Sequence, residues 1–124
     1  MKQALSFAAD RYKDLTVLVV DDSFNMRTTI KKMARTLGFG EILEASSGTA
    51  ALECLSQNVV DVVLCDWNMP GLKGIDVLKY VRSKADSKNL PFIMVTAEMS
   101  KAVVAESAES EVDDYLVKPF SLQD

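Results

Sequence analysis

Apolar residues occur in this chain as short continuous runs, separated by longer segments in which they recur every three or four positions. The first and third runs are nearly continuous in Val and Leu, which is typical of strands buried on both faces of a sheet. We predict five strands, at Thr16–Val20, Ile42–Ala45, Val59–Cys65, Phe92–Thr96 and Tyr115–Val117.

The segments between these runs have the periodicity of amphipathic helices. The clearest helix is predicted from Asn25 to Leu37, with Ser23 as its N-cap and Gly38 just beyond its last turn. Three further helices are expected to begin after Ser47, near Gly74 and after Ser100. Alternating strands and helices build βαβ units, so we predict a doubly wound α/β fold with a parallel sheet between two helical layers.

Composition is that of an ordinary globular domain and removes several functions. The chain has 124 residues, 48% of them apolar, and a formal net charge of −4, which argues against broad contact with nucleic acids or anionic membranes. It has no secretory signal and no apolar run long enough to span a bilayer. Histidine is absent, which excludes Ser-His-Asp and Cys-His catalysis and histidine-ligated metal sites. Cys54 and Cys65 lie in apolar surroundings and are expected to be buried thiols of a cytoplasmic protein, with a redox pair as the alternative.

Polar side chains that can carry chemistry follow four of the predicted strands. Asp21 and Asp22 follow the first strand, and Asp66 follows the third. Thr96 ends the fourth strand and Lys118 follows the fifth. Ligands of open parallel sheets bind beyond the carboxyl ends of the strands, near the point where the strand order reverses. We therefore expect these five side chains to gather at one edge of the sheet.

Each of these residues also has a purely structural interpretation. The acids could cap a helix or form a turn, Thr96 could be an ordinary strand residue, and Lys118 could be a surface lysine. Together they are complementary, because three carboxylates repel one another and Mg²⁺, a small hard cation, prefers carboxylate oxygens. A hydroxyl and an ammonium add partners for an anion with several oxygens, so the set predicts phosphoryl transfer. Asp66 stands alone at its strand end and is the predicted nucleophile, since Asp21 and Asp22 are paired as metal ligands would be.

Five motifs carry a resemblance to a known family. They are LVVDD (18–22) with Met26-Arg27, LGF (37–39), DWNMP (66–70), VTAE (95–98) and VKPF (117–120). In this order and spacing, over about residues 15–122, they resemble the receiver domain of bacterial two-component response regulators, most closely the single-domain chemotaxis type. The resemblance implies a flavodoxin-like sheet with strand order 2-1-3-4-5. It also implies a cytoplasmic regulatory phosphoprotein, which assists its own phosphorylation and dephosphorylation but is not an enzyme.

The resemblance implies a role for each residue that binds metal or phosphate. Asp66 would accept a phosphoryl group from the phosphohistidine of a sensor histidine kinase, and Lys118 would contact that group. Asp22 and Asp66 would bind Mg²⁺ directly. The backbone carbonyl of Asn68 would be a third ligand, and Asp21 would act through water.

The resemblance also implies how the domain switches. Thr96 and Tyr115 would form a switch pair that changes the face presented to a downstream output protein or a C-terminal output domain. Asn68 and Glu98 fall where the family tunes the rate of dephosphorylation. The family role is therefore a signalling switch controlled by phosphorylation.

Three stretches depart from the family pattern. Residues 70–74 are PGLKG in place of Pro-x-Met-Asp-Gly, so Lys73 is expected to alter affinity for metal or partner. Residues 109–114 are ESEVDD where the family has a Gly-Ala pair, which affects the fourth helix and the output surface. The sequence stops at SLQD, where the last helix of the family should begin.

These features predict two parts, a helical N-terminal extension at residues 1–14 and a receiver domain at residues 15–124 that lacks most of its last helix. Leu5, Ala8, Tyr12 and Leu15 recur at near-helical spacing in or beside the extension, and a frayed surface tail is the alternative. We expect the extension, or a second copy in a homodimer, to cover the exposed sheet face. We also expect the domain to belong to a longer protein with its output region downstream.

Three other functions fit parts of the pattern. A phosphohydrolase of the haloacid dehalogenase type needs an acid two residues after its nucleophile, where this chain has Asn68, and usually a cap domain. A flavin-binding module needs a phosphate-binding loop after the first strand, where Asp21 and Asp22 would repel phosphate. A receiver that has lost phosphorylation and serves only for binding is the third alternative, although all five key positions are present.

Overall fold

The structure is a computed structural model that describes residues 12–96 and 112–117, with residues 115–117 described by their backbone alone. The elements are β1 (Thr16–Val20), α2 (Phe24–Leu37), β2 (Glu41–Ala45), α3 (Gly48–Gln57), β3 (Val62–Asp66), α4 (Gly74–Ser83), β4 (Phe92–Thr96) and β5 (Asp114–Val117). They form one sheet in the order β2-β1-β3-β4-β5, with parallel pairing throughout. The predicted fold class and strand order are confirmed. The helix expected after Ser100 lies outside the described residues, as do residues 1–11 and 118–124.

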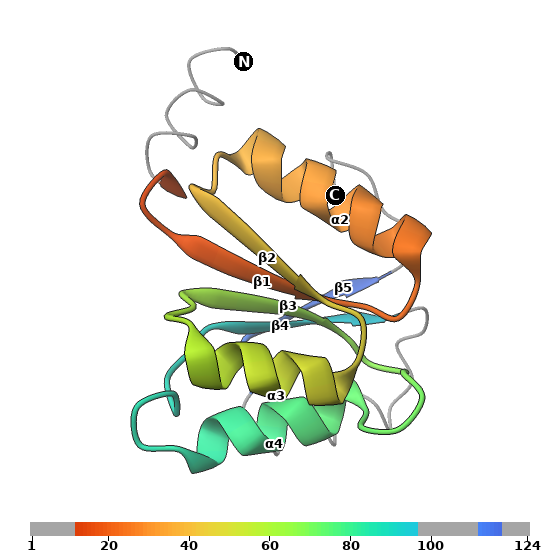
Figure 1. Cartoon of the computed structure of the whole chain (residues 1–124), viewed down its shortest axis with the longest axis vertical. Helices are drawn as coiled ribbons and strands as arrows, with labels where there is room; N and C mark the ends of the chain where they lie inside the picture. Colours follow the sequence, from red (N-terminus) through yellow and green to blue (C-terminus); the bar gives the residue numbers. More distant parts are fainter. Residues whose placement is uncertain (1–11, 97–111, 118–124) are drawn as a thin grey trace.

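The helices lie on both faces of the sheet, with α2 on one face and α3 and α4 on the other (Figure 1). This arrangement follows from the strand order. The chain moves outward from β1 to β2 and then returns past β1 to β3 and β4. Because βαβ crossovers are right-handed, a reversal of direction places the next helix on the opposite face. The reversal therefore lies between β1 and β3, the two central strands.

Each face of the sheet has its own apolar core. Under α2, buried side chains of β1, β3 and β4 meet buried side chains of the helix. The strand residues are Val17, Val19, Leu64 and Val95, and the helix residues are Ile30 and Ala34. Under α3 and α4 the core is larger and includes Leu18, Val63, Leu78, Val81, Phe92 and Met94, all fully or almost fully buried. β1 contributes to both cores at alternate positions, as the continuous apolar run predicts.

Predicted caps of the first helix are confirmed. The Ser23 hydroxyl accepts a hydrogen bond from the Met26 amide, which satisfies one of the free amides at the start of α2. Gly38 ends the helix in the left-handed conformation, with φ of 93°, and its amide donates to the carbonyls of Ala34 and Arg35.

The prediction for the third strand was wrong at its start, because β3 begins at Val62 and not at Val59. Asp61 sets this boundary: its amide donates to the Thr16 carbonyl at 2.8 Å, and its carboxylate accepts from the Thr16 amide at 2.7 Å. Val59 precedes this junction and is 85% exposed, and it is one of two large apolar side chains that are exposed among the described residues. Apolar character alone therefore predicted a strand that begins too early.

Residues 112–114 belong to the stretch that departs from the family pattern, and they form defined contacts. The Asp113 carboxylate accepts hydrogen bonds from the Phe92 amide at 2.7 Å and from the Arg82 guanidinium at 2.9 Å. Arg82 also donates to the Leu90 carbonyl. These hydrogen bonds connect the start of β5 with the start of β4 and with the end of α4.

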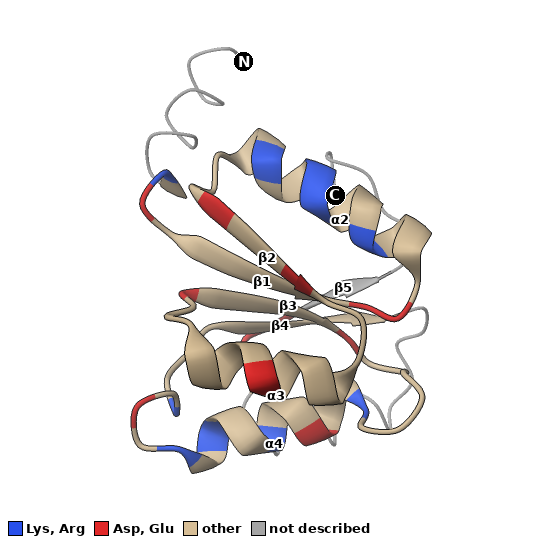
Figure 2. Ribbon diagram, viewed as in Figure 1, with Lys and Arg blue, Asp and Glu red and all other residues tan. Residues whose placement is uncertain are grey.

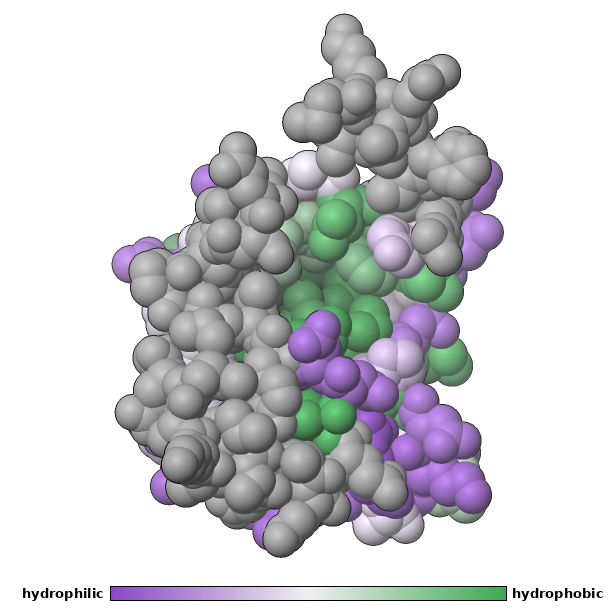
Figure 3. All heavy atoms as spheres, turned by 180° about the vertical axis from the view of Figure 1, so that it is seen from behind, coloured by the Kyte–Doolittle hydropathy of each residue, from purple (hydrophilic) through white to green (hydrophobic). Residues whose placement is uncertain are grey.

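The charged side chains are unevenly distributed over the helices. α2 carries four basic residues and no acidic one (Figure 2). Beneath this helix some apolar side chains stay partly exposed, among them Ile42, Val62 and Ile93, from three different strands. Hydrophobic surface also lies open on the face seen from behind (Figure 3).

Part of the predicted N-terminal extension is described. The ring of Tyr12 stacks on Phe39, with centroids 5.1 Å apart, and the carbonyl of Tyr12 accepts from the amides of Leu15 and Gly40. A turn at Lys13 and Asp14 follows Tyr12, so Leu15 does not continue the predicted helix. The end of the extension therefore packs on the turn between α2 and β2.

Candidate functional site

The site lies where β1 and β3 end side by side. Val20 of β1 is paired in register with Cys65 of β3, so the residues that follow them emerge at the same level. Asp21 and Asp22 follow β1, and Asp66 is the last residue of β3. Carboxylate oxygens of these three acids lie within 4.8 Å of one another. Asp21 and Asp66 are buried and Asp22 is exposed, so the cluster is open to solvent on one side.

Asp21 is fixed by hydrogen bonds at both its backbone and its side chain. Its amide donates to the carbonyl of Ala45 at the end of β2, at 3.1 Å. Its carboxylate accepts from the Ser23 amide at 2.8 Å, and its carbonyl accepts from the Arg27 guanidinium at 2.9 Å. The first-strand acids are thus held by β2 and by the first turn of α2.

Asp66 begins a loop that is folded back on the sheet. The Trp67 amide donates to the Val95 carbonyl at 2.8 Å, and the Trp67 carbonyl accepts from the Gly74 amide at 3.0 Å. The Asn68 amide faces the Asp66 carboxylate at 3.4 Å, so Asn68 lies beside the acid as predicted. The expectation that the backbone carbonyl of Asn68 binds the metal remains a prediction.

The remaining predicted site residues differ in how far the structure describes them. Thr96 is the last residue of β4, is 2% exposed, and follows Val95, the register partner of Asp66. The backbone of Tyr115 lies in β5 opposite Met94, and the structure does not describe the Tyr115 side chain. Glu98 and Lys118 lie outside the described residues. The structure therefore brings together Asp21, Asp22, Asp66, Asn68 and Thr96.

Lys73 is exposed and precedes the first residue of α4. Its amide donates to the Asp76 carboxylate at 2.9 Å, which closes the first turn of that helix. The predicted effect of Lys73 on metal or partner affinity stays a prediction.

A group of charged side chains beside the acids was missed by the sequence analysis, which noted Arg27 only as part of a motif. Arg27 donates through Nε to Glu44 at 3.0 Å, and Lys31 donates to the other oxygen of Glu44 at 2.7 Å. Hydrogen bonds from Lys31 and Arg27 hold the pKa of Glu44 below its usual range. A signal was available in the sequence, because Glu44 lies one residue before the end of β2, at the same edge as the aspartates.

The donor set fits a magnesium ion. Three carboxylates from two neighbouring strands offer hard oxygen ligands, and the exposed side of Asp22 leaves room for the waters that Mg²⁺ usually keeps. No histidine or thiolate that would favour a softer metal belongs to this group of three acids. The Cys65 thiol is close in sequence, but burial and the nearby charges of Asp66 and Asp21 raise its pKa well above the usual value.

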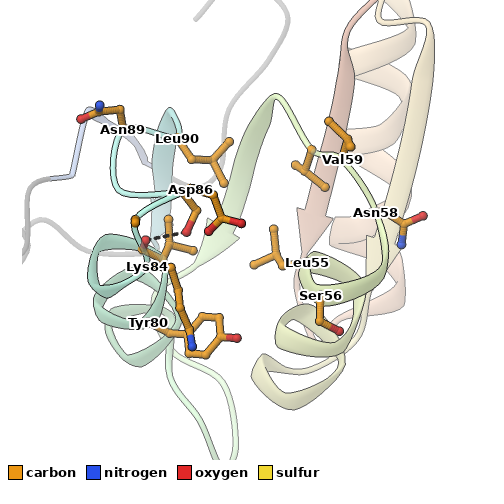
Figure 4. Close-up of a pocket in the computed structure, with 13 residues that line it drawn as sticks. Leu55, Ser56, Asn58, Val59, Tyr80, Lys84, Asp86, Asn89 and Leu90 are labelled. Carbon is orange, nitrogen blue, oxygen red and sulfur yellow. Dashed lines mark hydrogen bonds between the residues drawn. The ribbon is translucent and has the colours of Figure 1, made fainter.

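A cleft of about 640 Å³ lies at the opposite edge of the sheet, between the ends of α3 and α4 and the loop before β4 (Figure 4). Its walls are mixed: Leu55, Val59 and Leu90 are apolar, whereas Lys84 and Asp86 are charged. The strands run away from this edge toward the aspartates, so the cleft is separate from the acidic site.

Comparisons with known proteins give the family. The sequence profile of the response regulator receiver domain matches residues 17–124. The chain belongs to this family. It is 43% identical over 109 residues to chemotaxis protein CheY-3 of Vibrio cholerae, which covers 88% of this chain and 84% of that protein. It is 45% identical over 109 residues to chemotaxis protein CheY of Pseudomonas aeruginosa, with 88% of each covered.

Solved structures agree with this assignment. The receiver domain superposes on chemotaxis protein CheY4 of Vibrio cholerae with a TM-score of 0.83 at 32% identity, covering 88% of this chain and 90% of that one. A putative response regulator from Chloroflexus aurantiacus gives a TM-score of 0.83 at 34% identity, with 90% of each chain covered.

Membership in the response regulator receiver family gives the general role of the domain. It is a regulatory domain of the CheY type and takes part in two-component signalling that depends on phosphorylation. Receiver domains generally bind Mg²⁺ at an acidic pocket, and this chain has a cluster of three aspartates that could hold a metal ion. Among the described residues, no helix combines the length and the apolar character needed to cross a membrane.

Proposed function

We propose that Asp66 accepts a phosphoryl group from the phosphohistidine of a sensor histidine kinase. In this step the bond between phosphorus and the histidine nitrogen breaks, and a bond between phosphorus and a carboxylate oxygen of Asp66 forms. The observation that carries the proposal is the cluster of three carboxylates at the point where the strand order reverses. On the neighbouring strand β4, Thr96 follows Val95, the register partner of Asp66. Because no histidine occurs among these 124 residues, the donor histidine would lie outside them.

Three acidic side chains and one backbone oxygen would hold the metal. Asp22 and Asp66 would bind it directly, with the carbonyl of Asn68, and Asp21 would act through water. A bound Mg²⁺ supplies positive charge that offsets the charge of the transferring phosphoryl group. The bond that Asp21 donates to Ala45 and the bonds that it accepts from Ser23 and Arg27 prearrange it for this role, and Asp22 follows it directly.

Thr96 and Lys118 would bind the phosphoryl oxygens, and that contact would switch the domain. Thr96 lies buried at the end of β4, one residue beyond Val95, the register partner of Asp66. A modification shifts a two-state protein only if it contacts one state better than the other. Thr96 and Tyr115 would form the switch pair, and Asn68 and Glu98 would set how long the phosphoryl group persists.

The partners in this proposal are a sensor histidine kinase and an output protein or C-terminal output domain. A homodimer through the α2 face is also part of the proposal, since Val62 and Ile93 stay partly exposed there. Sedimentation at several protein concentrations measures it, and a monomer at all of them would contradict the dimer without affecting the phosphorylation site.

Incubation with a small phosphodonor tests the central step. We expect one phosphoryl group per chain in the intact mass when Mg²⁺ is present and none when it is chelated. Trp67 adjoins Asp66 in sequence and is the only tryptophan, so its fluorescence should respond to Mg²⁺ and again to the phosphodonor. Asp66→Asn should abolish phosphorylation. Asp86→Asn removes an exposed acid at the other edge of the sheet and is the matched control. Phosphorylation that persists in Asp66→Asn would contradict the proposal.

A further inference from the structure

Arg27 of α2 forms hydrogen bonds with two other segments beside the acidic site, which are the residues after β1 and the strand β2. It lies in the first turns of α2, donates through Nη1 to the carbonyl of Asp21 at 2.9 Å, and donates through Nε to Glu44 of β2 at 3.0 Å. Its side chain is 13% exposed, and its guanidinium lies 5.7 Å from the ring centroid of Phe24. A planar guanidinium presents its donors in a fixed fork, so two bonds of this kind restrict its position strongly.

The bond to the Asp21 carbonyl matters because of the peptide group that it fixes. This oxygen belongs to the peptide that joins Asp21 to Asp22. A peptide group is planar, so holding its oxygen also sets the direction of the Asp22 amide and of the chain that enters Asp22. The Asp22 carboxylate is the exposed member of the cluster, and the direction of its backbone limits where it can reach. Arg27 thereby acts on both acids through one bond.

Glu44 keeps the guanidinium in place. Lys31 bonds to the same carboxylate at 2.7 Å, but no hydrogen bond joins Lys31 to Asp21 or Asp22 in the described part of the chain. The two cations therefore share Glu44 as a partner, and of the two only Arg27 also contacts the peptide between the acids. This difference provides a matched control.

We propose that Arg27 is a positioning residue for the metal site: it holds the Asp21–Asp22 peptide so that both carboxylates face Asp66, and it thereby increases the affinity for Mg²⁺. The inference rests on the proposed function, because it assigns Mg²⁺ to the three aspartates. Side chains that orient metal ligands typically contribute a factor of 10 to 100 to metal affinity.

The charge of Arg27 alone would act in the opposite direction. A guanidinium near three carboxylates repels a dication, so removing it without any geometric effect should strengthen Mg²⁺ binding. Loss of positioning should weaken binding. The sign of the change in the dissociation constant therefore separates the two effects.

The experiment measures Mg²⁺ dissociation constants by Trp67 fluorescence for Arg27→Met, Arg27→Lys and the control Lys31→Met. We expect Arg27→Met to weaken binding about tenfold. Arg27→Lys keeps the charge but loses the fork, so it should also weaken binding and serves if Arg27→Met does not fold. Lys31→Met should leave the constant unchanged or slightly lower. Urea unfolding of each variant confirms that the folded state is being titrated.

Amide hydrogen exchange without metal gives a second readout. Exchange of the Ser23 amide, which donates to the Asp21 carboxylate, should accelerate in Arg27→Met relative to the global unfolding rate, and should not do so in Lys31→Met. Mg²⁺ binding to the unmodified chain, combined with equal or tighter binding in both Arg27 variants, would overturn this inference alone. Absence of Mg²⁺ binding to the unmodified chain would overturn the proposed function, and the inference with it.

Discussion

Gly74 permits a close backbone approach beside the acidic site. A Cβ atom at this position would lie 2.2 Å from the carbonyl oxygen of Asp66 and 3.0 Å from the sulfur of Met94. The first of these neighbours is backbone and cannot rotate away. The loop that carries Trp67 can therefore fold against the end of β3 only if residue 74 has no side chain.

Gly74→Ala should consequently affect both stability and the site. We expect the free energy of unfolding to fall by about 1–3 kcal/mol, as for other overpacked positions, and Mg²⁺ affinity to fall because Asp66 is displaced. Gly71→Ala is the control: its Cβ would meet nothing within 4 Å, and its φ of 76° makes alanine cost about 1–2 kcal/mol through strain alone. Urea unfolding and Trp67 fluorescence measure the two effects. Unchanged metal affinity in Gly74→Ala would refute the role given to this contact.

The two thiols should differ in reactivity. Cys65 is fully buried, and burial together with the charges of Asp66 and Asp21 raises its pKa well above the usual value. Cys54 is half-buried, and burial raises its pKa as well.

Since the thiolate is the reactive form, we expect Cys54 to react slowly with a thiol reagent at pH 8 and Cys65 to react only after unfolding. Intact mass should show one label on the native protein and two in urea. Cys54→Ser should remove the native label. Labelling of Cys65 in that variant under native conditions would contradict the expectation.

At the level of helices and strands, sequence periodicity predicted every described element, and the deviations have physical causes. The strand start at Val62 was missed because it depends on the pairing of Asp61 with Thr16, forty-five residues away in sequence. The gathering of the acids at one edge of the sheet was predictable, because the topology brings the carboxyl ends of parallel strands together. The contact of Arg27 with Glu44 was not, since it joins a helix to a strand through side chains whose directions periodicity does not give.

The contacts of Glu44 between α2 and β2 should make stability depend on pH. Its pKa is lowered in the folded protein, mainly by the hydrogen bonds from Lys31 and Arg27. Its contribution is therefore complete above the glutamate pKa of the unfolded chain, about 4.3, and is lost as the pH falls through the lower folded value.

We expect Glu44→Gln to lower the free energy of unfolding at pH 7 by up to about 1 kcal/mol, a small effect because Glu44 is exposed to solvent. The difference between the two proteins should shrink as the pH falls below about 4. Urea unfolding at several pH values measures it. A difference that grows in acid would show that the sign is wrong.

For the whole molecule, the acidic site links metal binding to folding. The three carboxylates come together only in the folded chain, because they lie in segments more than forty residues apart whose ends the sheet aligns. A ligand that binds only the folded state stabilises it according to its concentration.

At Mg²⁺ ten times above its dissociation constant, the free energy of unfolding should rise by about 1.4 kcal/mol. Thermal or urea unfolding with and without Mg²⁺ measures this rise. The rise should nearly vanish in Asp66→Asn and persist in Asp86→Asn. An equal rise in both variants would mean that the ion stabilises the protein elsewhere.

The parallel register has a consequence for how such a chain can diverge. A residue inserted within β3 would turn the side chains beyond it to the opposite face of the sheet, and Asp66 would leave the carboxylates of Asp21 and Asp22. Residues inserted before the strands, around Val59 or in the segment 84–91, would lengthen loops at the far edge and leave every pairing intact. Insertions and deletions in related genes should therefore accumulate at the edge with the cleft, while the segments that end at the aspartates keep their length.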